Sequence, residues 1–352
     1  MKKLLLLLLV SCSLLAKAQV YNNEWIDYTK TYYKFKVGKT GLYRIPQPIL
    51  ATAGLANAAG QDFQLWRNGV QVPIYTSSPS ILSSGDYIEF WGEMNDGKPD
   101  KALYRNPDYQ LNDKWSLETD TATYFLTINT TGNNLRLTTT PNNITGNTLP
   151  AEPYFMYTAG QYFKDRINPG YAVNVGEYMY SSSYDRGEGW TSGDIATGAA
   201  YSGTFSNLFV ATAGPNATFN IAVSGNAVNP RNYKVTINND SITGGPVDFF
   251  TYIRGAASVP ASLIATNSAI VKVFNQCEQP NDRIVVHQYE LTYPRQFNFG
   301  NATNFEFTLP ASAAGIDSRL SFRSQYSWPM TSDHSKSRDF HPPALMPFLT
   351  IL

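Results

Sequence analysis

The sequence predicts an all-β protein in which two antiparallel β-sandwich or jelly-roll-like domains follow a signal peptide. Short apolar runs of strand length recur along the 352 residues, clusters of Gly, Pro and Asn separate them, and helical periodicity is almost absent. Aromatic residues make up 14% of the chain and charged residues only 15%, with 23 Tyr and 19 Phe. This composition disfavours disorder and coiled coil and suits extracellular β-structure.

The first 18 residues have the organisation of a secretory signal peptide. Lys2 and Lys3 give a positive start, an apolar run covers residues 4–15, and Ala16-Lys17-Ala18 offers small residues for cleavage before Gln19. We therefore expect an exported protein, in the periplasm, on the outer-membrane surface or secreted. No later segment reaches the roughly 18 apolar residues of a membrane helix, so no membrane span is expected.

Cys12 leaves a second anchoring mode open. The stretch Leu9-Val10-Ser11-Cys12 has the small-residue-then-Cys pattern of a lipoprotein signal, although cleavage there would leave a very short apolar core. Cleavage after Ala18 instead leaves Cys277 as the only thiol, so no intramolecular disulfide is expected. Three of the 27 Lys and Arg lie in the leader, which leaves 24 against 27 acidic residues. This balance gives no electrostatic case for binding nucleic acid.

Residues 19–150 are expected to form an N-terminal β-domain. The clearest signal lies at residues 63–75, where Asn68-Gly69 separates two apolar runs and predicts a type I′ hairpin turn. A short helix is expected at residues 48–53, because Pro48 suits its first turn and Gly54 follows its end. Further strands of this domain are expected at residues 32–37, 42–45, 87–91 and 123–128.

Residues 151–315 are expected to form the second β-sandwich domain. The Thr-, Asn- and Pro-rich stretch at residues 138–153 is the best boundary between the two domains. Beyond it, runs of strand length recur between turn residues, as an antiparallel sandwich or jelly roll requires. These strands are expected at residues 204–212, 217–224, 233–238, 249–253, 269–274, 284–293 and 305–309.

No standard catalytic motif is complete in this sequence. Gly38-Lys39-Thr40 looks like the end of a phosphate-binding loop, but the leading Gly of that motif would fall at Tyr33, so a hairpin turn is the better interpretation. The chain has no G-x-S-x-G elbow, and its three histidines do not make an H-E-x-x-H site. The motifs therefore give no catalytic residue, cofactor or metal ligand.

Cys277 and His287 suggest a thiol–imidazole dyad, because a nucleophilic Cys needs a base to generate thiolate. They flank a hairpin that we expect to turn at residues 279–282, and His287 lies in an alternating strand. A structural thiol and a sheet-face imidazole are the favoured interpretation. An active hydrolase built on the two remains a third hypothesis.

Two polar clusters each allow two interpretations. The acidic loop at residues 93–100 has enough oxygen ligands for calcium, but the first EF-hand position would be Gly92, so a solvated loop is favoured. Asp185-Arg186-Gly187-Glu188-Gly189-Trp190 is the densest cluster of polar and aromatic residues. It would bind a sugar by stacking on Trp190, or form a locally ion-paired turn against the sandwich, and the turn is favoured.

Several motifs occur in a fixed order between residues 32 and 310, among them Gly85-Asp86-Tyr87-Ile88-Glu89-Phe90-Trp91-Gly92. The others lie at residues 33–37, 41–45, 65–69, 72–74, 117–127, 184–190 and 289–295. Together they resemble the amino-terminal part of the PorU-type sortases of the type IX secretion system, exported relatives of the gingipain cysteine peptidases. The resemblance implies a β-rich, propeptide-like region that precedes a peptidase domain.

The departure from that family limits what the resemblance implies. Its catalytic His and Cys belong to an α/β peptidase domain, and this chain has no alternating βα pattern and no His followed by Gly, so no catalytic position is carried over. The implied role is a non-catalytic scaffold or chaperone-like region, with a peptidase domain in cis or type IX secretion components as partners. The alternative is a free-standing secreted β-sandwich that binds carbohydrate or protein.

Residues 316–352 form an atypical tail. Asn, frequent earlier, does not occur after Asn304, and the stretch 318–337 is rich in Ser and Arg without alternation. A reading-frame shift near Gly315 is our hypothesis for this change, and we expect the tail to be dispensable for stability. Its four potential metal ligands match no standard spacing. They are Asp333, His334, Asp339 and His341.

Overall fold

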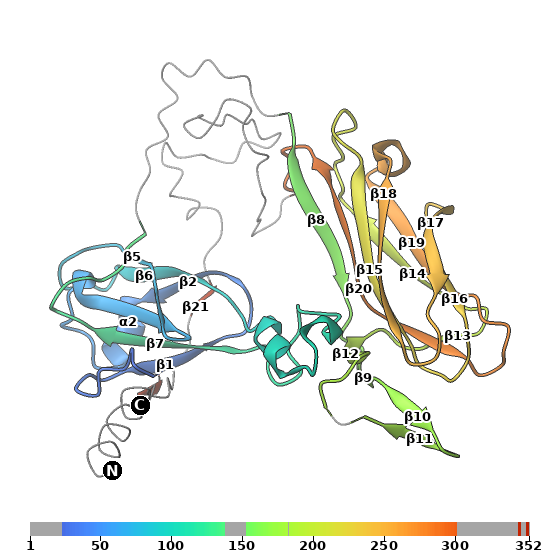
Figure 1. Ribbon diagram of the computed structural model, residues 1–352. Coiled ribbons are helices and arrows are strands. Elements are labelled where there is room, and N and C mark those ends of the chain that lie inside the picture. The colour runs from blue at the N-terminus through green and yellow to red at the C-terminus, as the bar shows by residue number, and fades with distance from the viewer. Residues whose placement is uncertain (1–22, 138–152, 182, 301–343, 346–349, 352) are drawn as a thin grey trace, which may run out of the picture.

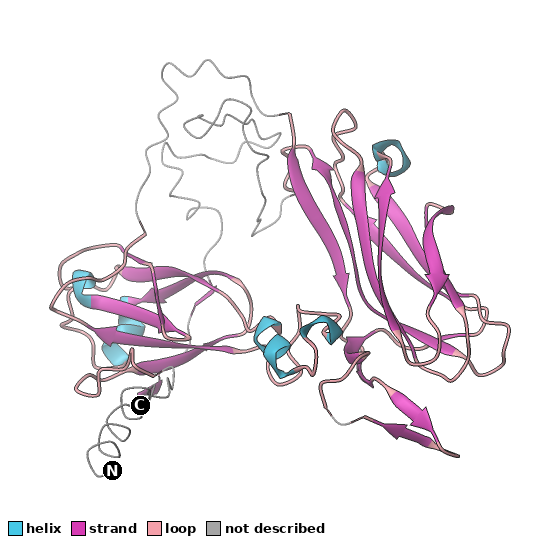
Figure 2. Ribbon diagram, viewed as in Figure 1, coloured by secondary structure: helices cyan, strands magenta, loops and turns pink. Residues whose placement is uncertain are grey.

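The computed structural model describes residues 23–137, 153–181, 183–300, 344–345 and 350–351 (Figure 1). The predicted all-β fold is confirmed, because strands in antiparallel sheets dominate and the helices of the described residues are short (Figure 2). None of those helices combines the length and apolar character needed to cross a membrane. The expected signal peptide, the boundary near residue 150, the strand at 305–309 and most of the tail lie outside the described residues.

The first β-sandwich has two sheets, with strand orders β22-β1-β7-β3-β4 and β21-β2-β6-β5. Its strands are β1 (Tyr33–Val37), β2 (Gly41–Pro46), β3 (Phe63–Arg67), β4 (Val70–Val72), β5 (Ile74–Thr76), β6 (Tyr87–Gly92), β7 (Ala122–Ile128), β21 (Ala344–Leu345) and β22 (Thr350–Ile351). Its helices are α2 (Gln47–Thr52) and the 3₁₀ turn η1 (Gly60–Asp62). The short helix expected at residues 48–53 is therefore present.

Alternation builds the core of the first sandwich. In β1, Phe35 and Val37 point inward and Lys36 outward, as the period of two requires. Phe35 stacks on Tyr124 of β7 with ring centroids 5.7 Å apart, and Phe90 of β6 completes the cluster. The β3–β4 hairpin turns at Asn68-Gly69 with φ of 49° and 76°, so the predicted turn is confirmed.

The second β-sandwich packs a five-stranded sheet on a four-stranded one. In the larger sheet β20 pairs with β15, β8 and β13, and β15 pairs with β18; the smaller has the order β14-β19-β16-β17. Its strands are β8 (Phe155–Tyr162), β13 (Ile195–Ala196), β14 (Ala200–Ser206), β15 (Ala217–Gly225), β16 (Asn232–Ile237), β17 (Asp240–Pro246), β18 (Tyr252–Val259), β19 (Ser268–Asn275) and β20 (Arg283–Arg295). The 3₁₀ turn η4 spans Ala261–Ile264.

Two small sheets lie beside the second sandwich. They pair β9 (Arg166–Pro169) with β12 (Glu188–Thr191), and β10 (Ala172–Asn174) with β11 (Tyr178–Tyr180). The core of the sandwich centres on Tyr289 of β20. The Tyr289 ring lies 5.4 Å from that of Phe205 and 5.9 Å from that of Phe219, which come from opposite sheets. The outward-facing positions of the same strands are left to solvent or to the neighbouring segments.

Two expected strands are displaced for a local backbone reason. The strand expected at residues 204–212 is β14, which ends at Ser206, because Asn207 and Phe209 have φ of 56° and 44°. The strand expected at 249–253 begins only at Tyr252, since Phe249 has φ of 54°. Left-handed residues cannot continue a strand, and an apolar run does not reveal them.

One expected hairpin is wrong. Residues 279–282 were expected to join two paired strands, but β19 and β20 belong to different sheets, so this connection crosses the sandwich. The sequence also missed β8, whose residues alternate weakly between buried and exposed, and β9–β13 and β17.

A buried ion pair closes the end of the second sandwich where this crossing occurs. Arg231 Nε lies 2.7 Å from Asp282 Oδ2, and both side chains are 0% exposed. Asn275 donates to the same carboxylate, and Arg231 donates to the carbonyl oxygens of residues 227, 247 and 249. Burial acts to raise the pKa of Asp282, but the hydrogen bonds from Arg231, Asn275 and Asn229 outweigh it and lower that pKa.

Asp282→Asn is expected to lower the free energy of unfolding by about 3 kcal/mol, because it leaves the Arg231 guanidinium buried without a counter-charge. Asp96→Asn, which removes the exposed pairing with Lys98, is the matched control and should cost under about 1 kcal/mol. Urea unfolding of both variants measures the difference. Equal costs would contradict this description of the pair.

Candidate functional site

The connection between β6 and β7 lies between the two sandwiches (Figure 1). It contains two 3₁₀ turns, η2 (Lys98–Leu103) and η3 (Pro107–Tyr109). We call residues 98–120 the connector. Both of its ends lead into strands of the first sandwich, β6 and β7, while its middle makes hydrogen bonds to the second sandwich.

Connector side chains donate to backbone carbonyl groups of the second sandwich. Asn112 Nδ2 lies 3.1 Å from the carbonyl oxygens of both Phe163 and His287. Trp115 Nε1 donates to the carbonyl of Tyr162 at 3.2 Å. Because Asn112 is buried, removing its amide would leave these two carbonyl groups without that partner and without access to water. The connector is therefore a structural joint between the sandwiches.

The acidic loop at residues 93–100 overlaps the start of the connector and holds the connector in shape. Asp100 is buried and accepts hydrogen bonds from Ser116 Oγ at 2.9 Å and from the Leu117 amide at 2.8 Å. Glu93 pairs with Arg67, and Asp96 with Lys98. The loop expected to be solvated thus has one buried carboxylate that bonds two points of the connector.

The Asp185–Trp190 cluster forms the other side of this joint. Asp185 lies 3.1 Å from Arg105 of the connector, and Trp190 Nε1 donates to the carbonyl oxygen of Ser116 at 2.8 Å. The pKa of Asp185 is lowered because hydrogen bonds from Ser181 and the Arg186 amide, together with the Arg105 charge, outweigh the effect of burial.

The expectation of a locally ion-paired turn needs correction. The salt-bridge partner of Asp185 is Arg105, from the connector, whereas the Arg186 guanidinium lies over the Tyr171 ring at 4.2 Å. Glu188 and Trp190 belong to strand β12, with Gly187 just before it and Gly189 within it. Trp190 uses its indole N–H inside the molecule, and Lys164 Nζ lies 5.3 Å from its ring centroid.

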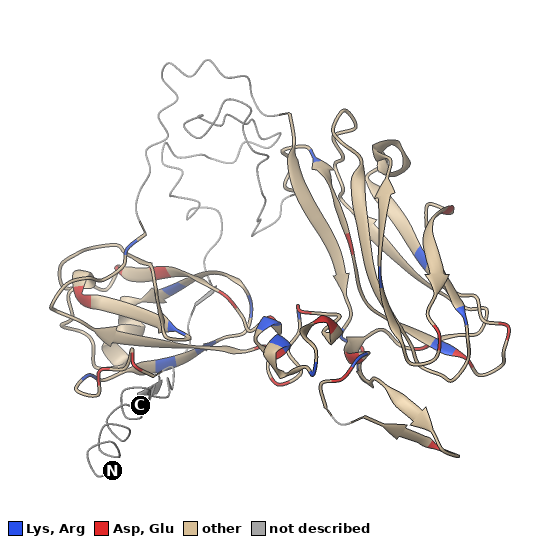
Figure 3. Ribbon diagram, viewed as in Figure 1, with Lys and Arg blue, Asp and Glu red and all other residues tan. Residues whose placement is uncertain are grey.

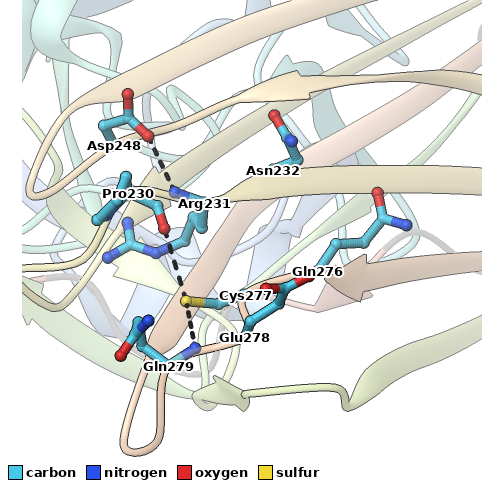
Figure 4. Close-up of a pocket in the computed structure, with 8 residues that line it drawn as sticks. All are labelled: Pro230, Arg231, Asn232, Asp248, Gln276, Cys277, Glu278 and Gln279. Carbon is cyan, nitrogen blue, oxygen red and sulfur yellow. Dashed lines mark hydrogen bonds between the residues drawn. The ribbon is translucent and has the colours of Figure 1, made fainter.

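Cys277 lies in the loop after β19, at an open cavity of about 350 Å³ (Figure 4). Its Sγ accepts from the Gln279 amide at 3.4 Å and lies 3.6 Å from the Pro230 carbonyl oxygen. Arg231 and Asp248 line the same cavity, where the Arg231 amide donates to Asp248. No histidine lies among the cavity's lining residues, which are Pro230, Arg231, Asn232, Asp248, Gln276, Cys277, Glu278 and Gln279.

His287 is fully buried and has a different partner. Its Nε2 lies 2.9 Å from Ser224 Oγ of β15, also fully buried. Its Nδ1 has no hydrogen-bond partner among the described residues, and a side chain added at Gly189 would lie 3.8 Å from that nitrogen. A Ser–His pair needs an orienting acid and access for substrate to act as a nucleophile, and this one is buried beneath β12. We interpret it as structural.

A β-bulge places His287 in this position. β20 pairs Val286 with Val223 and Gln288 with Ala222, so His287 is the extra residue. The sequence carries a signal for it that was missed: the core residues of β20 are even-numbered up to Val286 and odd-numbered from Tyr289. The bulge turns His287 out of the alternation and toward Ser224.

Comparisons with known proteins give likeness in structure alone. No protein-family model matches the chain, and no curated protein matches it. The structure of dimeric latent PorU from Porphyromonas gingivalis is similar over 77% of this chain, with a TM-score of 0.45 and 10% identity. The match covers 25% of that PorU chain, so this chain spans about a quarter of its length.

Carbohydrate-binding modules are similar over a smaller part of the chain. A CBM36 module in complex with calcium and xylotriose matches 38% of this chain and 98% of its own, with a TM-score of 0.25 and 10% identity. The CBM35 module from Cellvibrio japonicus Abf62 matches 40% of this chain and 99% of its own, with a TM-score of 0.23 and 12% identity. These likenesses concern β-rich architecture and do not assign a function.

Acid is expected to destabilise the protein through His287. Burial, and secondarily the charge of Arg254, lower the pKa of His287 from 6.5 to about 3. Between these two values the unfolded chain binds a proton at His287 and the folded chain does not. The stability that neutral His287 contributes is fully present above about pH 6.5. It is lost as the pH falls toward 3, at up to about 1.4 kcal/mol per pH unit.

The slope of unfolding free energy against pH measures the number of protons taken up on unfolding. His287→Gln should therefore reduce that number by about one between roughly pH 6 and pH 4. Urea unfolding at a series of pH values measures both slopes. The difference between the two proteins isolates His287 from the carboxylates that titrate in the same range. Parallel slopes would contradict the burial of a neutral imidazole.

Proposed function

We propose that this β-rich region is the non-catalytic scaffold of a type IX secretion sortase-like, gingipain-related cysteine peptidase, exported to the cell surface. The domain limits at residues 18, 150 and 315 are part of this proposal. The observation that carries it is the joint: segments from both sandwiches that resemble the family, at residues 117–127 and 184–190, meet at the connector. A scaffold for a further domain needs such a fixed relation between its parts.

The resembling segments within the first sandwich also have structural contacts. Arg44 of β2 lies 2.6 Å from Glu89 of β6, whose side chain is 0% exposed, and the Arg44 guanidinium stacks 3.8 Å above the Tyr87 ring. These residues come from two different motifs of the resemblance. Their role in pairing the strands supports a scaffold, because the motifs hold the sandwich together and leave the chemistry to a separate domain.

Sugar binding is a second candidate function. The outward face of the larger sheet in the second sandwich carries hydroxyl and amide side chains and few charges, which suits an uncharged polar ligand (Figure 3). A glycan array probed with the purified protein separates this candidate from the scaffold.

The scaffold proposal is tested by docking in trans. The purified chain is mixed with a separately produced, active-site-inactivated peptidase domain of a PorU-type sortase, and binding is measured by calorimetry. We expect a Kd of about 10 μM or tighter, as for interfaces of standard size. Trp190→Phe combined with Asn112→Ala, which loosens the joint, should weaken binding about tenfold.

Lys234→Ala on the outer face of β16 is the control and should bind like the unchanged chain. The circular dichroism spectrum of each variant verifies folding before binding is measured. Absence of a complex at about ten times the expected Kd would contradict the scaffold role.

A further inference from the structure

The outward face of the larger sheet is built of three cross-strand rows. Because directly paired residues of antiparallel strands share a face, the register of β8, β20, β15 and β18 defines each row. The first row is Thr158, Thr292, Thr218 and Ser258; the second is Gly160, Glu290, Asn220 and Ala256; the third is Tyr162, Gln288, Ala222 and Arg254.

The first row is composed of hydroxyl groups alone. Thr158 and Thr292 share a hydrogen bond of 2.8 Å, and Thr158 and Thr218 are exposed. Strands of one sheet lie about 4.8 Å apart, so the row presents donors and acceptors at a regular spacing. That spacing is close to the length of one pyranose unit in an extended polysaccharide.

The second row places two planar polar groups between small neighbours. Glu290 and Asn220 are directly paired, with Ala256 beside Asn220 and Gly160 beside Glu290. A side chain at Gly160 would lie 2.3 Å from the Tyr162 hydroxyl, so only Gly lets the Tyr162 ring lie across this strand. Tyr162 then donates to Glu290 Oε1 at 2.5 Å and fixes the carboxylate.

The third row is closed by the connector. Arg254 donates to the Gln110 carbonyl oxygen, and Lys114 Nζ lies 5.2 Å from the centroid of the Tyr162 ring. This leaves the first row open, together with the part of the second row that the Tyr162 ring does not cover, and the connector borders them on one side. Glu290 and Arg254 are the only charged residues of the three rows, and Arg254 is already engaged.

We propose that the first two rows form a binding site for a neutral oligosaccharide that runs across the strands, with Glu290 and Asn220 hydrogen-bonded to its hydroxyl groups. The site deepens the second candidate function and rests on it. Carboxylate and amide groups pair with vicinal hydroxyls in a planar geometry, and the Thr and Ser hydroxyls add partners of either polarity. A single carboxylate without a free cation disfavours acidic glycans and nucleic acid.

The test is titration calorimetry of the purified chain with cellohexaose, xylohexaose and mannohexaose. We expect at least one of these probes to bind with a Kd of about 0.1–1 mM. Asn220→Ala and Glu290→Gln should each weaken that binding about tenfold. Asn220→Ala removes a hydrogen-bonding group, and Glu290→Gln replaces the charged acceptor, which makes the stronger hydrogen bonds, by a neutral amide. Thr218→Val should weaken it about threefold.

Thr204→Val, an exposed strand Thr on the opposite sheet, is the matched control for Thr218→Val and should leave binding unchanged. If none of the three probes binds at about 5 mM, or if Asn220→Ala and Glu290→Gln bind as the unchanged chain does, the site is rejected. Glycan-array binding that both variants retain would preserve sugar binding as a function while rejecting this face. If the unchanged protein binds no glycan of the array, sugar binding is rejected as a function.

Discussion

The connector constrains the arrangement of the whole chain. Both of its ends are tied to β6 and β7, and β7 is an inner strand of its sheet, so the first sandwich holds it firmly. Its middle satisfies carbonyl groups at the end of β8 and at the bulge of β20. Moving one sandwich against the other would break these hydrogen bonds, and each carbonyl group left buried without a donor costs about 1–3 kcal/mol.

The sequence predicted the elements whose signals are local. β1, the β3–β4 turn and β7 follow from alternation and from Asn68-Gly69, which needs no distant partner. The errors arise where distant contacts or single φ angles decide. Phe249 lies in an apolar run that predicts a strand, but its backbone has the left-handed conformation. The ion-pair partner of Asp185 is Arg105, which lies far away in the sequence. The sequence therefore contains no sign that the Asp185–Trp190 cluster contacts the connector.

The buried polar groups of the described residues serve architecture. Arg231 with Asp282 ties the crossing between sheets, Asp100 shapes the connector, and Ser224 with His287 fills the space under β12. Cys277 and His287 have separate partners in separate elements, so the sequence-level dyad is not assembled. The outward rows of the larger sheet, in contrast, hold polar groups that face solvent, and this is where a ligand has access.

Differential scanning calorimetry of the chain tests most directly whether the joint couples the two sandwiches. We expect one cooperative transition for the unchanged protein, with equal calorimetric and van't Hoff enthalpies, because neither sandwich unfolds without losing the joint. Trp190→Phe combined with Asn112→Ala and Trp115→Phe should separate it into two transitions. Two resolved transitions in the unchanged protein, or a triple variant that still unfolds in one step at the original midpoint, would contradict that coupling.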